Sequence, residues 1–334
     1  LRYPDLDIRG RTYLLPAYLA LRLRAAGIRT VWISGWTLRS IPELTWMVSI
    51  LKRAGLRVVF DPIDPICEFL AAMREGEEGN EAEDRVCIDR MRAVYQQCDL
   101  VMSVTPELQE LLVSNGAPSD RMLTARWTTD GELFHPARCG RSLKQRLGLS
   151  EDTFLAGWLG TMEPFKGLLE VILPMIEESA RNSDGIHFVI AGRGSLEPEV
   201  RKWIAARDGL PVTVLPSIPY AEAPDFTASL DAYLVPTNPK TMYAQSICPI
   251  KCFDALAMGT PLVLTRTRAT GFLTQYGKLV SFADFTPHSF LEQLHRVRDM
   301  VRSEGRPAPC DGYSHQRVSV EMADALENLF ASKK

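Results

Sequence analysis

The sequence has no long apolar run and few cysteines and histidines. Its 334 residues contain no apolar stretch of the ~18–20 residues that a membrane-spanning helix needs, and no signal peptide is visible. The seven cysteines include no CxxC pair and the five histidines do not cluster, so we expect no metal site, even at Cys248 and Cys252. We expect unpaired cysteines, used as small apolar residues in a reducing cytoplasm.

The sequence also lacks a strong overall charge. The net charge is −3 and the sequence pI is about 6.0, so we expect no nucleic-acid partner. The charge is uneven, however, because residues 1–60 hold ten Lys or Arg and three Asp or Glu. This basic end can lie against an anionic membrane, which would place the protein peripherally at the inner face. A solvated helix face is the alternative explanation.

Apolar strand-like segments alternate with helical periodicity, most regularly in the second half of the chain. We expect strands at residues 153–159, 187–191, 212–215, 232–235 and 261–265. We expect helices between them at residues 167–181, 198–207, 221–229 and 250–258. This alternation predicts an α/β fold with a parallel sheet covered on both faces. Ligands of such sheets bind at the carboxyl ends of the strands.

The first half predicts a similar but less regular pattern. Strands are expected at 30–34, 57–60 and 100–104, and helices at 12–26, 42–54, 85–97 and 106–115. Ser40 and Thr105 are expected N-caps, and the acidic, Gly-broken segment 74–84 is an expected loop without fixed structure. The predicted domains are 1–150 and 151–310, followed by a C-terminal segment, 311–334, that is helical over 313–330.

Two segments that follow expected strands carry cations. Gly160–Gly167 turns from a strand into a helix, and its backbone N–H groups together with Lys166 would attract a phosphate. In Gly192–Gly194, Arg193 can form a bidentate contact with a diphosphate, and the segment lacks the third glycine of a dinucleotide fingerprint. Taken singly, each is also an ordinary turn with a solvent-facing cation.

Two further segments complete the pattern. Residues 217–220 form a loop in which Ile218 or Tyr220 can pack on a flat base. Residues 249–263 read as a basic loop, a short helix carrying Asp254, a glycine stop and a strand. Asp254 can accept hydrogen bonds from the two vicinal hydroxyls of a ribose, while Lys251 faces a phosphate. The order and spacing of the four segments favour a single nucleotide-sugar site.

As a set, these segments resemble the donor domain of a GT-B glycosyltransferase of the retaining family 4 type (glycosyl transferases group 1). The resemblance covers about residues 153–265 and extends loosely to 98–105 and 130–136 in the first half. It implies two Rossmann-like domains whose parallel sheets face each other across a cleft. The family's opening strand and Gly-rich acceptor loop are not found, so we expect an N-terminal domain that is incomplete at its start.

The resemblance also implies roles for individual residues. Lys166 and Arg193 would be the catalytic cations on the donor diphosphate, and Asp254 would bind the ribose. The remaining donor-binding positions would be Gly160, Thr161, Ile218, Ser246, Ile247, Cys248 and Lys251. Many relatives have a glutamate where this chain has Ser246, although a subgroup with Pro-x-Lys before the acid lacks it, as Pro249-Ile250-Lys251 does here.

A second departure concerns the first domain. Relatives often place a His-Asp or Arg-Asp pair after a strand there, facing the reacting carbon, and the matching position reads Ile63-Asp64. Asp64 is therefore the third catalytic candidate, with Asp61 beside it. Both also suit turn positions before Pro62 and Pro65.

The expected function is that of a cytoplasmic glycosyltransferase without cofactor or metal. It would move a sugar, with retention, from a UDP- or GDP-linked donor to a glycan, lipid-linked or small-molecule acceptor. Two alternatives stay open at this point: a non-catalytic binding or scaffold protein on a GT-B frame, and a sugar-nucleotide epimerase.

Overall fold

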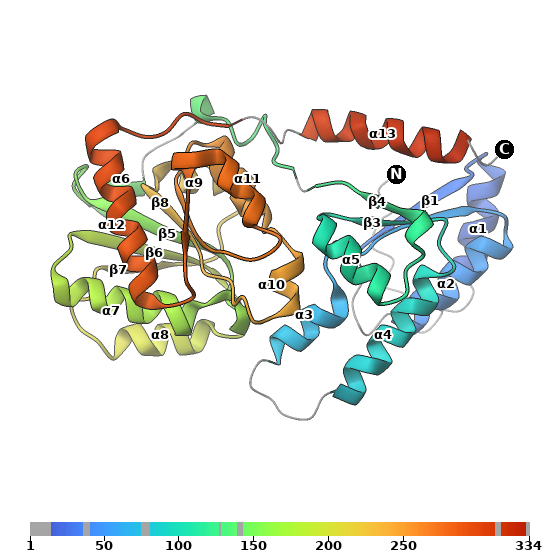
Figure 1. Ribbon diagram of the computed structural model, residues 1–334, viewed down its shortest axis with the longest axis horizontal. Coiled ribbons are helices and arrows are strands. Elements are labelled where there is room, and N and C mark those ends of the chain that lie inside the picture. Colours follow the sequence, from blue (N-terminus) through green and yellow to red (C-terminus); the bar gives the residue numbers. More distant parts are fainter. Residues whose placement is uncertain are drawn as a thin grey trace. The chain divides into compact units, whose positions relative to one another are not determined.

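A computed structural model describes residues 15–35, 41–74, 81–126, 128–138, 143–310 and 315–331, which fall into two compact units (Figure 1). The first unit comprises Leu1–Ala71 and Glu77–Ala125, and the second comprises Ala72–Gly76 and Arg126–Lys334. Residues 126–150 thus group with the second unit, whereas the sequence suggested a boundary near 150. The expected N-cap Ser40, residues 75–80 of the expected loop 74–84 and the starts of the helices expected at 12–26 and 313–330 lie outside the described residues. Residues 81–84 of that expected loop are instead helical.

The first unit is built on a parallel sheet of four strands in the order β1-β2-β3-β4. The strands are β1 (Thr30–Ser34), β2 (Arg57–Asp61), β3 (Leu100–Ser103) and β4 (Met122–Thr124). The helices are α1 (Leu15–Ala25), α2 (Ile41–Arg53), α3 (Ile66–Met73), α4 (Glu81–Tyr95) and α5 (Pro106–Ser114). The α5 N-terminus forms as predicted, because the Thr105 hydroxyl accepts a hydrogen bond of 2.9 Å from the Leu108 N–H. The sequence did not predict α3 or β4.

A disulfide joins α3 to α4. Cys67 and Cys87 are bonded, with their Cα atoms 5.8 Å apart, so the expectation of unpaired cysteines is wrong for these two. Their spacing in the sequence carries no recognisable motif, since pairing across two helices depends on how the helices pack. The free cysteines among the described residues are Cys98, Cys248, Cys252 and Cys310.

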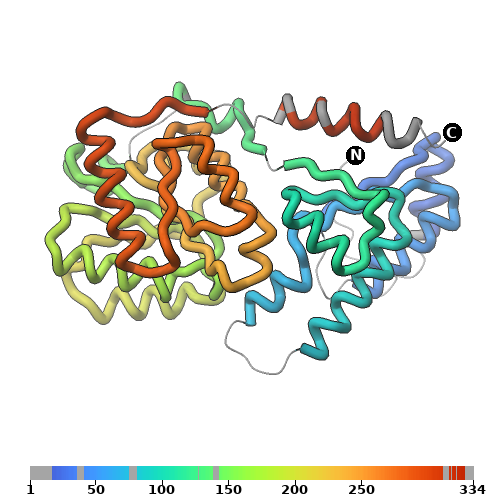
Figure 2. Tube along the Cα trace, in the orientation of Figure 1, coloured from blue at the N-terminus to red at the C-terminus, as the bar shows by residue number. Residues whose placement is uncertain are grey.

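The second unit holds a parallel sheet of six strands in the order β10-β9-β8-β5-β6-β7. Figure 2 traces the Cα path of the chain, coloured from blue at the N-terminus to red at the C-terminus. Its strands are β5 (Phe154–Thr161), β6 (Ile186–Arg193), β7 (Val212–Leu215), β8 (Ala232–Val235), β9 (Leu262–Thr265) and β10 (Val280–Ala283). Its helices are α6 (Leu143–Leu147), α7 (Leu173–Asn182), α8 (Glu197–Ala205), α9 (Ala223–Ser229), α10 (Met242–Ser246), α11 (Ile250–Ala257), α12 (Pro287–Glu304) and α13 (His315–Ala331). All five strands expected here are confirmed, while α10, β10 and α12 were not predicted.

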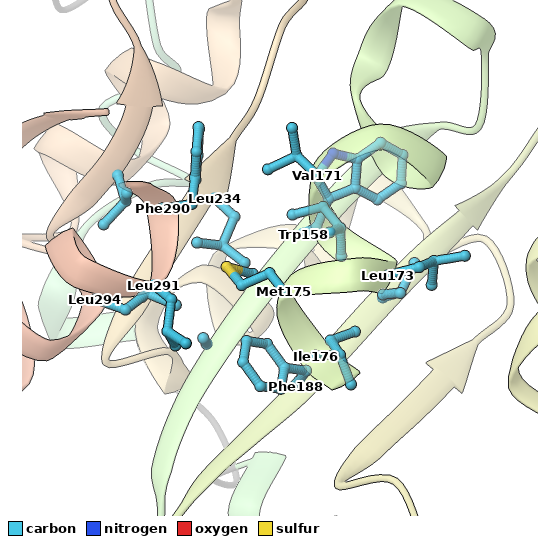
Figure 3. Packing of buried hydrophobic residues seen from close by; sticks show 14 of the residues in the cluster. Trp158, Val171, Leu173, Met175, Ile176, Phe188, Leu234, Phe290, Leu291 and Leu294 are labelled. Atoms are coloured by element: carbon cyan, nitrogen blue, oxygen red, sulfur yellow. The ribbon is translucent and has the colours of Figure 1, made fainter. Parts of the chain in front are cut away.

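Helices cover both faces of this sheet. Alternate residues of a strand point to opposite faces, so Trp158 packs into one apolar cluster and its β5 neighbour Leu155 into another. Figure 3 shows the first cluster, in which Phe188 of β6 lies among side chains of α7 and α12 such as Ile176 and Leu291. The second cluster includes residues of α9 and α11. The predicted two-sided burial is confirmed. Because the strands are parallel, their carboxyl ends lie at one edge of the sheet.

None of the described helices is both long enough and apolar enough to cross a bilayer.

Candidate functional site

The carboxyl ends of β5 and β6 lie side by side in register. Gly160 pairs with Gly192, and Thr161 pairs with Arg193. The φ of Gly192 is +142°, and a Cβ there would lie 1.8 Å from the carbonyl oxygen of Gly160. Only glycine permits strand ends to approach this closely. The backbone N–H of Met162 also donates to the Arg193 carbonyl at 2.8 Å, which holds the exposed Arg193 side chain at the carboxyl edge of the sheet.

Lys166 follows β5 in a 3₁₀ turn, Pro164–Lys166, and is positioned by two aromatic rings. Its Nζ lies 4.5 Å from the ring centroid of Phe165 and 5.3 Å from that of Tyr243. These rings meet edge to face with their centroids 4.9 Å apart. Because Tyr243 belongs to α10, this helix supports Lys166 through cation–π attraction.

Lys251, in the first turn of α11, reaches back to β5. Its ammonium donates a hydrogen bond to the carbonyl of Leu159 and lies 5.0 Å from the ring centroid of Trp158. The pKa of Lys251 is lowered to about 7, chiefly by burial and also by repulsion from Lys166, against the raising effects of Cys252 and Asp254. Lys166 and Lys251 are therefore close enough to interact as like charges.

Asp254 lies one helical turn beyond Lys251. The Thr129 hydroxyl donates to its carboxylate at 2.7 Å. Burial raises the pKa of Asp254 to about 7, although the Thr129 hydrogen bond and the charge of Lys251 each lower it. Burial also raises the pKa of Tyr220, and Asp254 adds to this effect, so a ring that is 58% exposed lies within electrostatic range of the carboxylate.

These side chains form a cationic edge with one acid beside it. Lys166 and Lys251 interact with each other, and Arg193 extends from the neighbouring strand end. Backbone groups at strand ends and cationic side chains of this kind attract phosphate oxygens. A carboxylate that already accepts one hydroxyl hydrogen bond can accept others, because each of its oxygens has two lone pairs.

Three expected donor-binding side chains are buried in the structure. The Ser246 hydroxyl donates to the carbonyl oxygens of Met242 at 2.8 Å and Tyr243 at 3.2 Å. Ile247 is 4% exposed and Cys248 is 1% exposed, and Cys248 packs into the core cluster beneath the sheet. A ligand would meet these three residues through their backbone.

Ile218 lies further along the edge, after β7. Its partly buried side chain packs against the second core cluster. It also lines a cavity with Ser217, Pro219 and residues of α6 and α9, including Arg146 and Phe226. The neighbouring Tyr220 ring lies 5.8 Å from that of Phe134, so both positions proposed to pack on a base are held by apolar contacts.

Asp64 belongs to the first unit, at the carboxyl end of β2. Its backbone N–H donates to the Pro62 carbonyl at 2.7 Å. The Asp61 carboxylate accepts from the Ile63 N–H at 3.1 Å, as in an Asx turn, and burial raises the pKa of Asp61. Ile63 has a φ of +63°, a costly conformation for a β-branched residue that often accompanies a functional turn.

Thr129 is the site residue that sequence reasoning missed. It lies in an irregular segment without periodicity, and a single threonine carries no motif. Among the residues that the structure describes, no three His, Cys, Asp or Glu side chains are grouped as a metal would require.

Comparisons with known proteins agree with this architecture. Residues 153–299 match the family described as Glycosyl transferases group 1. A D-inositol 3-phosphate glycosyltransferase of Streptomyces avermitilis is 24% identical over 261 residues, which cover 73% of this chain and 54% of that enzyme. The chain thus spans about half the length of this curated relative.

Solved structures share the fold over nearly the whole chain. HepE of Anabaena, in complex with UDP, superimposes with a TM-score of 0.68 at 14% identity, covering 94% of this chain and 82% of that one. Sucrose-phosphate synthase of Thermosynechococcus elongatus gives 0.67 at 13% identity, covering 97% and 80%. Two Rossmann-like units with parallel sheets place the chain in the GT-B fold class. Within the second unit, residues 153–299 resemble a glycosyltransferase domain of the group 1 type.

Proposed function

We propose that this protein transfers a sugar from a nucleoside-diphosphate sugar to a hydroxyl acceptor. The observation that carries the proposal is the set of cations at one sheet edge, Lys166, Lys251 and Arg193, next to Asp254. The group 1 family match and the UDP bound to HepE support it. A UDP-linked donor is the first choice, with a GDP-linked donor next.

The cations would act on the leaving group. When the bond between the anomeric carbon and the diphosphate oxygen breaks, negative charge grows on the diphosphate. Preorganised positive groups stabilise this charge more in the transition state than in the ground state. Lys166 and Arg193 would supply that stabilisation without a metal ion. The acceptor hydroxyl would then give its proton to the departing diphosphate as its oxygen bonds to the anomeric carbon with retention of configuration.

Asp254 would hold the nucleoside. Its carboxylate would accept hydrogen bonds from the ribose hydroxyls, while the loop with Ile218 and Tyr220 would pack on the base. In the first unit, Asp64 is the remaining proposed catalytic residue, because it follows the end of β2 next to Ile63, whose φ is positive. The acceptor would be a glycan, a lipid-linked sugar or a small molecule that offers a hydroxyl.

A donor screen tests the proposal. UDP-, GDP-, ADP- and dTDP-linked sugars would be compared first by their stabilisation of the folded protein, which grows with ligand saturation. The donor that binds would then be incubated with candidate acceptors, and release of nucleoside diphosphate and the anomeric configuration of the product would be measured. We expect slow hydrolysis without acceptor and faster turnover with one. Binding without any release would instead indicate a non-catalytic binding protein.

A further inference from the structure

The ammonium of Lys251 packs against the end of β5. It donates to the Leu159 carbonyl, and the space beside it exists because residue 160 has no side chain. The Tyr233 hydroxyl of β8 lies 3.5 Å from the same carbonyl oxygen. No carboxylate among the described residues forms an ion pair with Lys251, so its charge is not neutralised by a close partner.

The charged groups around Lys251 come from several elements. Lys166, after β5, opposes its positive charge, while Cys252 and Asp254 on α11 favour it. Asp254 is itself partly protonated near neutral pH, because burial raises its pKa to about 7. Its carboxylate also accepts a hydrogen bond from the Thr129 hydroxyl. Asp254 therefore gives incomplete compensation, and an ammonium that is buried beside another ammonium is costly.

We propose that binding of a nucleoside diphosphate at this site takes up one proton on Lys251, so that donor affinity is tied to pH. This inference rests on the proposed function. Above neutral pH the amine of the empty site is largely neutral. An arriving diphosphate supplies the negative charge that the surroundings lack, and the amine takes a proton from solvent to become the ammonium that contacts the phosphate.

Calorimetry of UDP binding at pH 8 isolates this event. At that pH the Asp254 carboxyl is mostly ionised, and a terminal phosphate with a second pKa of about 6 is fully ionised, so neither exchanges much proton. Binding heats in Tris and in HEPES differ in proportion to the protons exchanged with the buffer. The wild-type protein should take up about half to one proton per UDP, and its UDP affinity should fall by up to about tenfold per pH unit between pH 8 and 9.

Two variants and a control make the test specific. Lys251→Met should bind UDP more weakly, without proton uptake and without the pH dependence. Lys251→Arg keeps a charge that does not titrate, so it should also bind without proton uptake. Lys202→Met removes an exposed lysine on α8 and should behave as wild type. Binding to wild type without proton exchange, or unchanged uptake in Lys251→Met, would overturn the inference alone. Absence of binding by UDP, GDP, ADP and dTDP would overturn the proposed function with it.

Discussion

A Cβ atom on Gly160 would lie 2.6 Å from the Nζ of Lys251. Position 160 is the penultimate residue of β5 and Lys251 is the second residue of α11, so the absence of a side chain in one element makes room for the cation of another. In the same position the ammonium reaches the Leu159 carbonyl. Gly160 thereby determines the position of the Lys251 ammonium at the edge of the sheet.

Gly160→Ala should therefore impair the site while sparing the fold. The added methyl would displace only the flexible end of a lysine, so the thermal midpoint should change little. A misplaced cation should lower kcat/KM by about 10–100-fold, as small errors in position do in catalytic sites. Gly271→Ala is the matched control, because no atom lies within 4 Å of a Cβ built there. Equal activity of the two variants would show that the placement of Lys251 does not matter.

Lys166→Ala and Arg193→Ala test the stabilisation of the leaving group. Each should lower kcat by about 10²–10³-fold, by analogy with removal of a single oxyanion donor. Both side chains lie at the sheet edge outside the main core, so the far-ultraviolet circular dichroism should stay unchanged. Steady-state kinetics with the identified donor measure the effect, with Lys202→Ala as the surface control. Wild-type turnover in both site variants would reject the assigned roles.

Much of the second unit could be predicted because its signals are local. The strands β7 and β8 begin and end where their apolar residues do. The same holds in the first unit for α5, which Thr105 caps through a contact three residues away. Lys166 and Arg193 were identified because each lies at or just after a strand end, and Lys251 and Asp254 because they lie on a basic loop and short helix that precede a glycine and a strand. The contacts of the site were not predictable. Thr129 meets Asp254 across 125 residues, and the pairing of Cys67 with Cys87 depends on how α3 and α4 pack.

The disulfide should contribute measurably to stability. It closes a loop between residues 20 apart in sequence, and loop closure of this size restricts the unfolded chain by about 3 kcal/mol. Cys67→Ser/Cys87→Ser should lower the free energy of unfolding by an amount of that order, and reduction of the wild type should do the same. A thiol count of the denatured protein should rise by two on reduction. An equal count before and after reduction would show that the bond does not form in solution.

The free energy of unfolding of the ligand-free protein should pass through a minimum near neutral pH, because of Asp254 and Lys251. The folded pKa of Asp254 is about 7, against 3.8 for the free group, so between these values the folded state binds more protons and stability falls as pH rises. The folded pKa of Lys251 is about 7, against 10.5, so between 7 and 10.5 the unfolded state binds more protons and stability rises with pH. Each group changes the free energy of unfolding by at most about 1.4 kcal/mol per pH unit.

Urea unfolding at pH 5, 7 and 9 measures both slopes against matched variants. Asp254→Asn does not titrate, so its stability relative to wild type should increase from pH 5 to pH 7 and then level off. Lys251→Met should show its largest advantage over wild type at or below pH 7, and that advantage should shrink at pH 9, where the wild-type amine is neutral. Parallel pH profiles of wild type and both variants would mean that neither group is shifted in the folded protein. Saturating UDP should abolish the Lys251 slope, because the bound diphosphate keeps the ammonium charged.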